Sequence, residues 1–457
     1  MKIVGLVSIV IVLASPLVLI RSPANESATD EAGMGFFTPA PEHQIRRPDS
    51  EPKWSPDGRT ILFRREGAVL AVGQDGGSTR PVVKQGSVTW LPNGKLGVSS
   101  YPGVYTMNPN RSGKRLITTG KLRTWSPDGR KVVVSRYSPE PDTTGVLVVD
   151  VRTGAERPIP RPRCGNLSAA ARRSPRRCSW TDDQPVWSPD SKRLFFVARF
   201  IDSSGRQWFE LDIVNADGTN LRRVAKANEE IEKIVWSPQG DRVAATAWDE
   251  SGRVLWVISV ESGSKARIGR GATPRWSPSG DLLAYRRVDG VYVSRPDGSG
   301  VTRLWGPSGP NRSPQWSRDG QSILWGSGPS IVVSSVDGGK GRTIAEGVDA
   351  VWSPENDRIA FATPRCGADQ GVYVVRPDGS DVTRLSRHCT IYGTSLPERI
   401  VGTPADDTIV ARDRRCFGDG SPCTRSGKDQ VDCGDGVDRA IVDRIDAVRN
   451  CERVRRG

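Results

Sequence analysis

The chain contains only two histidines, His43 and His388, in 457 residues. No HExxH string and no GxSxG string occurs anywhere in the sequence. A histidine-assisted nucleophile, a zincin-type zinc site and the nucleophile elbow of a hydrolase therefore lack their usual elements. We expect His388, which stands beside Cys389, to be a loop residue rather than a catalytic group. Catalysis by paired carboxylates stays open, because 52 acidic residues allow many combinations that only a fold can sort.

Long apolar runs are confined to the amino terminus, where the uncharged residues 3–20 follow Lys2. Such a run is typical of a secretory signal peptide, and the small residues at 22–24 offer a cleavage site. The run also reaches the lower limit for a membrane span, so residues 1–24 are a signal peptide or an uncleaved anchor. We expect a protein that is secreted or lies on the exterior of the cell envelope, with membrane contact only through an uncleaved anchor. The first cysteine is Cys164, so no lipid-accepting cysteine follows the run.

The eight cysteines form no CxxC pair and have no histidine-rich partner set, which argues against a metal cluster. An even number of cysteines in an exported chain predicts disulfides instead. Pairing of sequence neighbours would close four short loops, each contributing about 2–4 kcal/mol in the chain-entropy model, although spacing alone does not fix the connectivity. The expected pairs are Cys164 with Cys178, Cys366 with Cys389, Cys416 with Cys423, and Cys433 with Cys451.

The formal net charge is +14, and arginine supplies most of the excess. Such a charge attracts polyanions, but the basic residues are scattered, as on an ordinary solvated surface, and no specific nucleic-acid binding is predicted. A local cluster lies between Cys164 and Cys178. This cluster either binds an anionic partner or is a tolerated surface insertion. Its members are Arg172, Arg173, Arg176 and Arg177.

A tryptophan followed by a tight-turn tetrapeptide, as in WSPDG, occurs eight times. Successive tryptophans are separated by 36, 35, 62, 49, 40, 40 and 36 residues. A period of about forty residues is the size of one four-stranded propeller blade. The eight are Trp54, Trp90, Trp125, Trp187, Trp236, Trp276, Trp316 and Trp352.

The residues around each motif predict the four strands of a blade. Serine, proline, aspartate and glycine fit the four positions of a type I turn, so a hairpin should follow. Apolar segments such as 60–63 then form second strands, and segments such as 372–375 and 382–385 form third and fourth strands. Each motif tryptophan ends a first strand, where we expect its ring to fill the gap between neighbouring blades rather than to bind a ligand.

These strings resemble the TolB-type β-propeller repeat over residues 51–386. The resemblance implies an all-β propeller, and such repeats occur in periplasmic assembly proteins, peptidase regulatory domains and uronate lyases. The amino-terminal α/β domain of TolB has no counterpart here, since residues 25–50 are a polar stretch that we expect to be a flexible linker, so a role in the Tol system is not implied. Eight motifs predict eight blades without an exchange of strands between the ends, or seven if the motif at Trp90 opens an incomplete blade.

The carboxy-terminal segment, residues 391–457, has a shorter period. Residues 393–401 and 402–410 share a nine-residue register with an acid at the sixth position and isoleucine at the eighth. Over 391–455 the segment resembles degenerate RTX-type repeats, which implies a β-roll that binds calcium through sixth-position aspartates and glycine-turn carbonyls. Incomplete glycine positions leave a metal-free, disulfide-stapled solenoid as the alternative, and residues 440–454 fit a strand or a helix. Carried over residue by residue, the ligands would be Asp407 and Asp438, with Glu398 as a poorer substitute and the carbonyls of Gly402 and Gly434.

The function most consistent with these features is an exported, non-enzymatic scaffold that binds a protein, a peptide or an anionic cell-wall polymer. The alternative is an extracellular carbohydrate-active hydrolase or lyase that uses carboxylates or arginines at the propeller channel. A third hypothesis is a calcium-dependent adhesion module in the carboxy-terminal segment. Acids that converge at one channel mouth would favour the enzyme, and a channel lined by valine, threonine and proline would disfavour it. The sequence assigns no catalytic residue.

Overall fold

The computed structural model describes most of one compact unit, Glu42–Gly457. Every regular element within the described residues is a β-strand. In this part of the chain we find no helix with the length and hydropathy that crossing a membrane requires. The described residues are 45–136, 145–160, 177–180, 185–201, 205–305, 313–363, 370–392, 399–401, 406–411, 430–433, 438–442 and 446–456.

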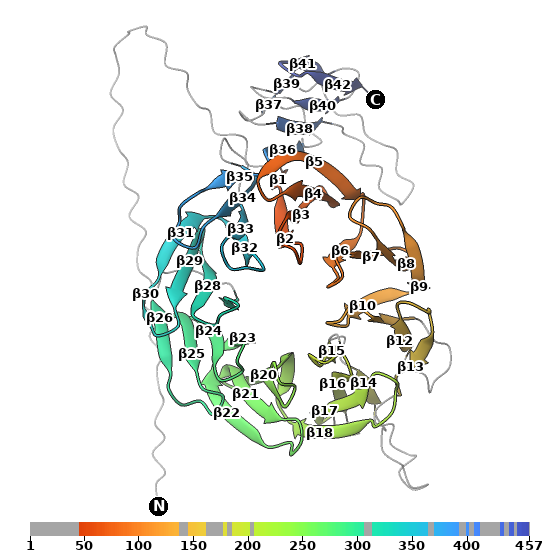
Figure 1. Ribbon diagram of the computed structural model, residues 1–457, viewed down its shortest axis with the longest axis vertical. Helices are drawn as coiled ribbons and strands as arrows, with labels where there is room; N and C mark the ends of the chain where they lie inside the picture. The colour runs from red at the N-terminus through yellow and green to blue at the C-terminus, as the bar shows by residue number, and fades with distance from the viewer. Residues whose placement is uncertain are drawn as a thin grey trace, which may run out of the picture. The chain divides into compact units, whose positions relative to one another are not determined.

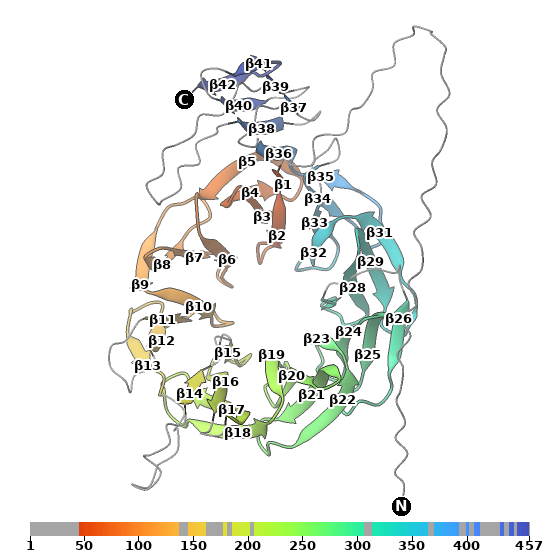
Figure 2. The same cartoon turned by 180° about the vertical axis from the view of Figure 1, so that it is seen from behind.

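Eight antiparallel sheets follow one another along the chain and form a ring of blades (Figures 1 and 2). The prediction of an eight-bladed propeller is confirmed, and the blade at Trp90 is complete. Blades 1 to 4 contain β2 (Ser50–Trp54), β3 (Thr60–Arg65), β4 (Ala68–Gly73) and β5 (Gly76–Val83); β6 (Ser87–Trp90), β7 (Leu96–Ser100), β8 (Gly103–Met107) and β9 (Arg115–Thr119); β10 (Lys121–Trp125), β11 (Lys131–Ser135), β12 (Val146–Asp150) and β13 (Glu156–Pro158); and β15 (Val186–Trp187), β16 (Arg193–Ile201), β17 (Gln207–Asn215) and β18 (Arg222–Ala227).

The second half of the ring repeats the same order of strands. Two short strands were not expected from the sequence: β14 (Arg177–Trp180) pairs with β16 in blade 4, and β30 (Gly339–Lys340) pairs with β26 in blade 6. Blades 5 to 8 contain β19 (Glu230–Trp236), β20 (Arg242–Asp249), β21 (Gly252–Ser259) and β22 (Lys265–Arg270); β23 (Ala272–Trp276), β24 (Leu283–Arg287), β25 (Gly290–Ser294) and β26 (Thr302–Trp305); β27 (Gln315–Trp316), β28 (Ser322–Ser327), β29 (Ser330–Ser335) and β31 (Arg342–Glu346); and β32 (Val348–Trp352), β33 (Ile359–Ala362), β34 (Val372–Val375) and β35 (Thr383–Arg384).

The antiparallel meander of each blade gives the ring two different faces. Turns between the first and second strands, which are the tryptophan motifs, lie on one face, together with turns between the third and fourth strands. Turns between the second and third strands lie on the opposite face, together with the connections from one blade to the next. We call these the motif face and the connection face.

The side chains of the WSPDG motif are used to build its turn. In blade 1 the buried Ser55 hydroxyl accepts the Thr60 N–H at 2.9 Å and lies 2.5 Å from the Asp57 carboxylate. This hydroxyl contact is the largest cause of the lowered pKa of Asp57, and the Arg59 N–H adds to it. Gly58 closes the turn with a φ of 68°, a left-handed conformation that favours glycine. The serine, the aspartate and the glycine of the motif therefore each have a local structural role.

The motif tryptophans lie at the seams between blades, as the sequence predicts. In five of them the indole N–H donates to the backbone carbonyl of the residue just before the tryptophan of the preceding blade. This bond ties the first strands of neighbouring blades together. The five bonds are Trp90 to Lys53 (3.2 Å), Trp236 to Val186 (3.1 Å), Trp276 to Val235 (3.1 Å), Trp316 to Arg275 (2.9 Å) and Trp352 to Gln315 (3.5 Å).

Arginines at the start of second strands reinforce two of these seams. The Arg193 guanidinium lies 5.3 Å from the Trp236 ring of the next blade and donates to the Gly240 carbonyl at 2.9 Å. Arg242 repeats the arrangement one blade on, 5.1 Å from the ring of Trp276. Part of the arginine excess in the sequence is therefore structural.

The ring closes around a buried carboxylate. Asp49 precedes blade 1, and its buried carboxylate accepts two hydrogen bonds from Arg65, at 2.8 and 2.7 Å. The Ser386 hydroxyl, which follows the last strand of blade 8, donates to the same carboxylate at 2.6 Å and accepts the Val372 N–H at 2.9 Å. Blades 1 and 8 keep their own four strands, as expected, and Asp49 joins the two ends of the ring.

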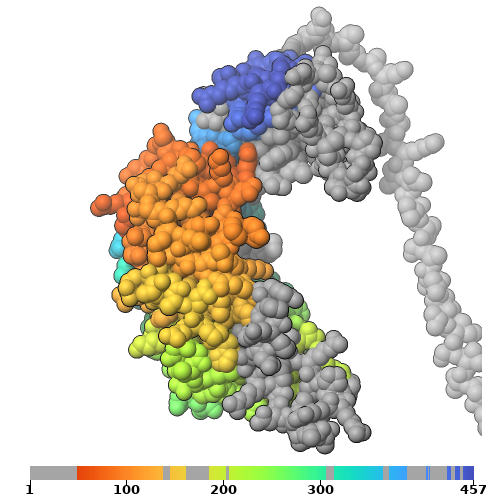
Figure 3. All heavy atoms as spheres, turned by 90° about the vertical axis from the view of Figure 1, so that its right-hand side faces the viewer, coloured from red at the N-terminus to blue at the C-terminus, as the bar shows by residue number. Residues whose placement is uncertain are grey.

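A small solenoid follows the last blade, and Figure 3 shows its atoms, in blue, next to the orange atoms near the start of the propeller. His388, expected in a loop, instead opens its first strand. The described parts of 440–454, which are residues 440–442 and 446–454, contain strands and no helix, so the helical alternative is wrong there. One parallel sheet contains β36 (His388–Tyr392), β38 (Asp406–Ala411), β40 (Arg439–Val442) and β42 (Arg453–Arg456), with β1 (Ile45–Pro48) antiparallel on β36, and the second contains β37 (Arg399–Val401), β39 (Gln430–Asp432) and β41 (Ala447–Arg449).

One described step of the solenoid agrees with the nine-residue register, whereas the steps from β38 to β40 (Thr408 to Arg439) and from β40 to β42 (Arg439 to Arg453) are 31 and 14 residues. Cys389 pairs with Asp407, so the step from β36 to β38 equals two nine-residue units. Ile409 occupies the eighth position of its unit and is fully buried. Residues 45–50, which the sequence assigns to the linker, form β1 and the start of β2. The chain therefore enters and leaves the propeller through the edge of the solenoid sheet.

Phenylalanine substitutions at two seams separate the indole hydrogen bond from ring packing. Trp236 and Trp187 are 6% and 5% exposed, but only Trp236 has an acceptor for its N–H among the described residues. We expect Trp236→Phe to lower the free energy of unfolding by about 1 kcal/mol more than Trp187→Phe, because phenylalanine cannot donate the bond. Urea denaturation followed by circular dichroism measures both losses. Equal losses would contradict a stabilising role for the seam bond.

Candidate binding site on the connection face

A central pocket of about 720 Å³ opens between the first strands of blades 7, 8 and 1. Its apolar wall includes Trp325 and Ile331, and Arg286 reaches it from blade 6. Two acids, Glu51 and Asp349, line the same pocket at the starts of their strands. The pocket thus combines an apolar wall with charges of both signs, as small-molecule and peptide sites do.

The two acids of the central pocket share an unusual backbone conformation. Glu51 and Asp349 have φ angles of 52° and 56°, and Thr273 in blade 6 has a φ of 51°. Each stands three residues before a motif tryptophan, where the pairing of the first and second strands shifts register. Left-handed non-glycine residues are costly and concentrate at functional sites, so this repeated bulge marks the pocket as a candidate site.

The acids of the central pocket are held by their neighbours. The Glu51 carboxylate accepts a hydrogen bond from Arg64 at 2.9 Å, and the Glu51 N–H donates to the Asp349 carboxylate at 3.4 Å. These contacts place the two acidic residues side by side across the seam between blades 8 and 1. Acids therefore do meet at one end of the ring, but as a pair rather than as a cluster.

A second cavity, of about 550 Å³, lies on the same face between blades 5 and 6. Turns between second and third strands form its rim, where Trp248 is 44% exposed and Val288 is fully exposed. Arg286 lines this cavity as well as the central pocket, so the two are neighbours. We call it the arginine groove, after its lining residues Arg253, Arg270, Arg286 and Arg287.

Contacts within the protein hold these arginines in place. Arg253 lies 4.6 Å from the ring of Trp248 and donates two hydrogen bonds to Glu232, at 2.6 and 2.9 Å. The guanidinium of Arg287 lies over the ring of Tyr292 at 4.3 Å, and its Nε donates to the Arg270 carbonyl at 3.0 Å. An arginine held in this way loses little conformational entropy on binding.

The inner strands add positive charge near the centre of the ring. Burial lowers the pKa of Arg275, which is the residue before the motif tryptophan of blade 6. Burial, and then the positive charge of Arg275, also lower the pKa of Lys233 on the first strand of blade 5. Cations that are partly withdrawn from water attract an anionic ligand more strongly than exposed ones.

The basic cluster expected from the sequence is not brought to this site by the described residues. Arg172, Arg173 and Arg176 lie outside them, and Arg177 is described only as the first residue of β14. The groove arginines come from separate turns and strand ends, and their spacing in the sequence does not predict that they lie close together. The one sequence signal that could have indicated them is the presence of arginines next to the predicted turns between second and third strands, such as Arg253, Arg286 and Arg287.

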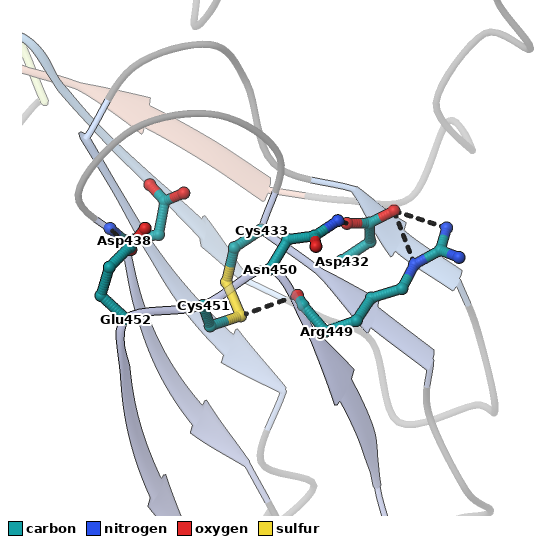
Figure 4. The surroundings of a disulfide bond; sticks show 7 residues. All are labelled: Asp432, Cys433, Asp438, Arg449, Asn450, Cys451 and Glu452. Atoms are coloured by element: carbon teal, nitrogen blue, oxygen red, sulfur yellow. Dashed lines mark hydrogen bonds and ion pairs between the residues drawn. A yellow bond between two sulfur atoms is a disulfide. The ribbon is translucent and has the colours of Figure 1, made fainter.

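One predicted disulfide is confirmed, between Cys433 and Cys451, with a Cα–Cα distance of 5.2 Å (Figure 4). The other three pairs stay predictions. Cys178 and Cys389 are described only as strand residues, without their side chains. Outside the described residues lie Cys164, Cys366, Cys416 and Cys423.

The described residues do not assemble the expected calcium ligands. Asp438 is 1% exposed, and its N–H donates to the Glu452 carboxylate. Asp432 lies on the other side of the disulfide, bonded to Arg449 and Asn450 (Figure 4). Within the part of the chain that is described, no group of three or more histidine, cysteine or acidic side chains could hold a metal. Asp407 is described only as a residue of β38, and Glu398, Gly402 and Gly434 lie outside the described residues.

Part of the propeller is similar in sequence to a known family and to known proteins. Residues 191–387 match the TolB beta propeller domain. The chain is 24% identical over 268 residues to the uncharacterized protein Atu1656 of Agrobacterium fabrum, a match that covers 52% of this chain and 83% of that protein. It is 28% identical over 144 residues to the Tol-Pal system protein TolB of Bordetella pertussis, covering 29% of this chain and 33% of TolB. The chain thus spans about a third of the length of that TolB.

Among solved structures, the propeller is similar to dipeptidyl peptidase 4 of Porphyromonas gingivalis. The TM-score is 0.53 with 14% sequence identity, and the match covers 73% of this chain and 59% of the peptidase. At this identity the similarity concerns the fold alone. The sequence of residues 191–387 is thus similar to the TolB beta propeller domain, the structural similarity concerns the propeller fold, and the activity of the chain has to be argued from its own residues.

One strongly perturbed acid lies away from both pockets of the propeller. Asp212 on β17 is 4% exposed, and burial raises its pKa to about 7. The Glu210 carboxylate adds to the rise, and Arg223 opposes it. Asp212 lines neither the central pocket nor the arginine groove. We interpret it as a buried acid that costs stability once it ionises, rather than as part of the site.

The raised pKa of Asp212 predicts a pH-dependent gain for Asp212→Asn. Stability from the protonated acid is fully present below about pH 4 and is lost as the pH rises through about 7. The variant should therefore match the wild type near pH 4 and exceed its free energy of unfolding by up to about 4 kcal/mol at pH 8. Urea denaturation at several pH values measures this.

Asp217→Asn is the matched control for that series. Asp217 sits in the next turn, and its hydrogen bonds to Thr219 lower its pKa, so its contribution has the opposite sign. Asp217→Asn should therefore lower the free energy of unfolding, relative to the wild type, by more at pH 8 than at pH 3. A gain for Asp212→Asn that did not change with pH would contradict ionisation as its cause.

Proposed function

We propose that the protein is an exported, non-enzymatic scaffold that holds a partner on the connection face of its propeller. The observation that carries the proposal is the joint opening of the central pocket and the arginine groove on that face, with Arg286 in both. Rigidly held arginines, an exposed indole and a strained inner rim form a concave surface with a net positive charge. Such a surface suits a protein, a peptide or an anionic wall polymer.

Exposed apolar side chains on the same face favour a protein or peptide among these partners. Tyr101 and Val288 are fully exposed, and Trp248 is 44% exposed. All three stand at turns between second and third strands, in blades 2, 6 and 5. Aromatic residues and arginine dominate the energetics of protein interfaces. The match to the TolB beta propeller domain supports the same class of function.

Capture of a partner from cell-envelope extracts tests the proposal. The full chain on beads should retain a protein or an anionic polymer, and Trp248→Ser with Val288→Ser should retain at least about tenfold less, since both side chains would be desolvated by a partner. Leu116→Ser is the control, because Leu116 is 51% exposed on a fourth strand. No retained partner, together with turnover of a polymer by the purified protein, would overturn the proposal.

The carbohydrate-active alternative has one specific observation in its favour, which is the pair of acids in the central pocket. Glu51 and Asp349 could act on a sugar held beside Arg286, since paired carboxylates are the groups that glycoside cleavage uses. Assays of the purified chain with acidic polysaccharides test this alternative. It requires measurable turnover that Glu51→Gln and Asp349→Asn both abolish without changing the melting temperature.

Calcium binding by the carboxy-terminal solenoid is a further part of the proposal. The parallel sheets and the nine-residue register support it. Asp407 and Asp438 would be ligands, with Glu398 and the carbonyls of Gly402 and Gly434. If calcium binds the folded chain, millimolar calcium should raise the melting temperature and a chelator should reverse the rise. Magnesium is the control, and equal melting temperatures with calcium and with chelator would contradict the proposal.

A further inference from the structure

We propose that the arginine groove binds an acidic peptide segment that carries an apolar residue beside its carboxylates. This inference rests on the proposed scaffold function and names the ligand class of the same site. The groove volume of about 550 Å³ lies within the range of about 300–1,000 Å³ that binding pockets occupy.

The charge of the groove selects an anion. Six arginines and three acids lie in or next to it. Glu232 pairs with Arg253 at 2.6 Å, Asp249 pairs with Arg267 at 3.1 Å, and Asp289 lies 3.6 Å from Arg303. Asp249 also lies 3.9 Å from Arg270. The six arginines exceed the three acids by three positive charges, and Arg270, Arg286 and Arg287 line the groove itself.

The geometry of these arginines favours carboxylates. Arg270 is 46% exposed at its side chain and donates to the Ser251 carbonyl at the rim of the groove. Arg287 is fixed by its bonds to the Arg270 carbonyl and to the Tyr285 hydroxyl at 3.3 Å. A guanidinium has five N–H donors, and these internal contacts use only part of the set. Planar guanidinium groups held in this way match carboxylates through paired hydrogen bonds.

Apolar surface beside the arginines favours binding of a peptide over binding of a uniformly polar polyanion. Arg253 covers one region of the Trp248 ring at 4.6 Å, and 44% of this side chain still faces solvent. Val288, at the turn between β24 and β25, is fully exposed on the opposite rim. A peptide can place an apolar side chain between these two residues and carboxylates on the arginines. A polyphosphate or a polyuronate has no matching apolar group.

Fluorescence anisotropy with defined probes tests the inference. The probe is a fluorescein-labelled hexapeptide of sequence Glu-Phe-Glu-Glu-Phe-Glu, titrated with the full chain. We expect Arg270→Gln and Trp248→Ser each to weaken binding by about tenfold, which equals about 1.4 kcal/mol. Affinity should also fall as salt rises. The control is Arg318→Gln, since Arg318 is exposed and paired with Glu355 on the motif face. Melting temperatures of all variants verify folding.

Competing probes decide the ligand class. An all-glutamate hexapeptide and an oligogalacturonate should each bind at least about tenfold more weakly than the labelled peptide. Equal binding of either probe, no binding of the peptide, or wild-type affinity in Arg270→Gln would overturn the inference. The capture experiment keeps the two proposals apart. A partner retained equally by the wild type and Arg270→Gln overturns the acidic-peptide assignment and leaves the scaffold, whereas no retained partner overturns the scaffold itself.

Discussion

The contact between each indole and the first strand of the preceding blade is the constraint on which the ring depends. A four-stranded sheet of this size has little core of its own, so it has to bury both faces against neighbours. Trp236 shows how one side chain does this. Its ring packs edge-on against Phe195 of the preceding blade at 5.6 Å, while its N–H bonds the Val186 carbonyl. Because the acceptor is the residue before the tryptophan of the preceding blade, the position of one first strand fixes that of its neighbour.

The seams are not equivalent, and the exceptions show where another interaction takes over. The indole nitrogens of Trp54, Trp125 and Trp187 are buried without a hydrogen-bond partner among the described residues. At the Trp125 seam, Gly97 lets the ring approach so closely that a Cβ atom there would lie 2.6 Å from it. At the Trp54 seam the ends of the ring meet, and the carboxylate of Asp49 bonds both Arg65 and Ser386. Pairing of β1 with β36 continues this junction into the solenoid.

The sequence predicts the repeated part of the molecule well, because local chemistry dictates it. The turn needs its serine, aspartate and glycine, and the seam needs its tryptophan, so motif spacing is enough to predict eight blades. The nine-residue register likewise placed Ile409 in the solenoid core. The sequence did not reveal the strand β1 or the role of Asp49, because both depend on partners more than 300 residues away, as the 337-residue separation of Asp49 and Ser386 shows. A short polar strand has no periodicity that pattern analysis can detect.

The residues of the candidate site could not be predicted from the sequence for a related reason. On the motif face the side chains of the repeat are used to build the fold, since Ser55 and Asp57 form hydrogen bonds within their own turn and Trp54 packs in a seam between blades. On the connection face the turns between second and third strands and the connections between blades have no repeated motif, so residues such as Trp248 and Val288 at the turns and Arg270 at a blade connection can differ from blade to blade at little cost to the fold. A surface that folding leaves unconstrained can be specialised for a partner. The residues of the candidate site are therefore those that the repeat does not specify.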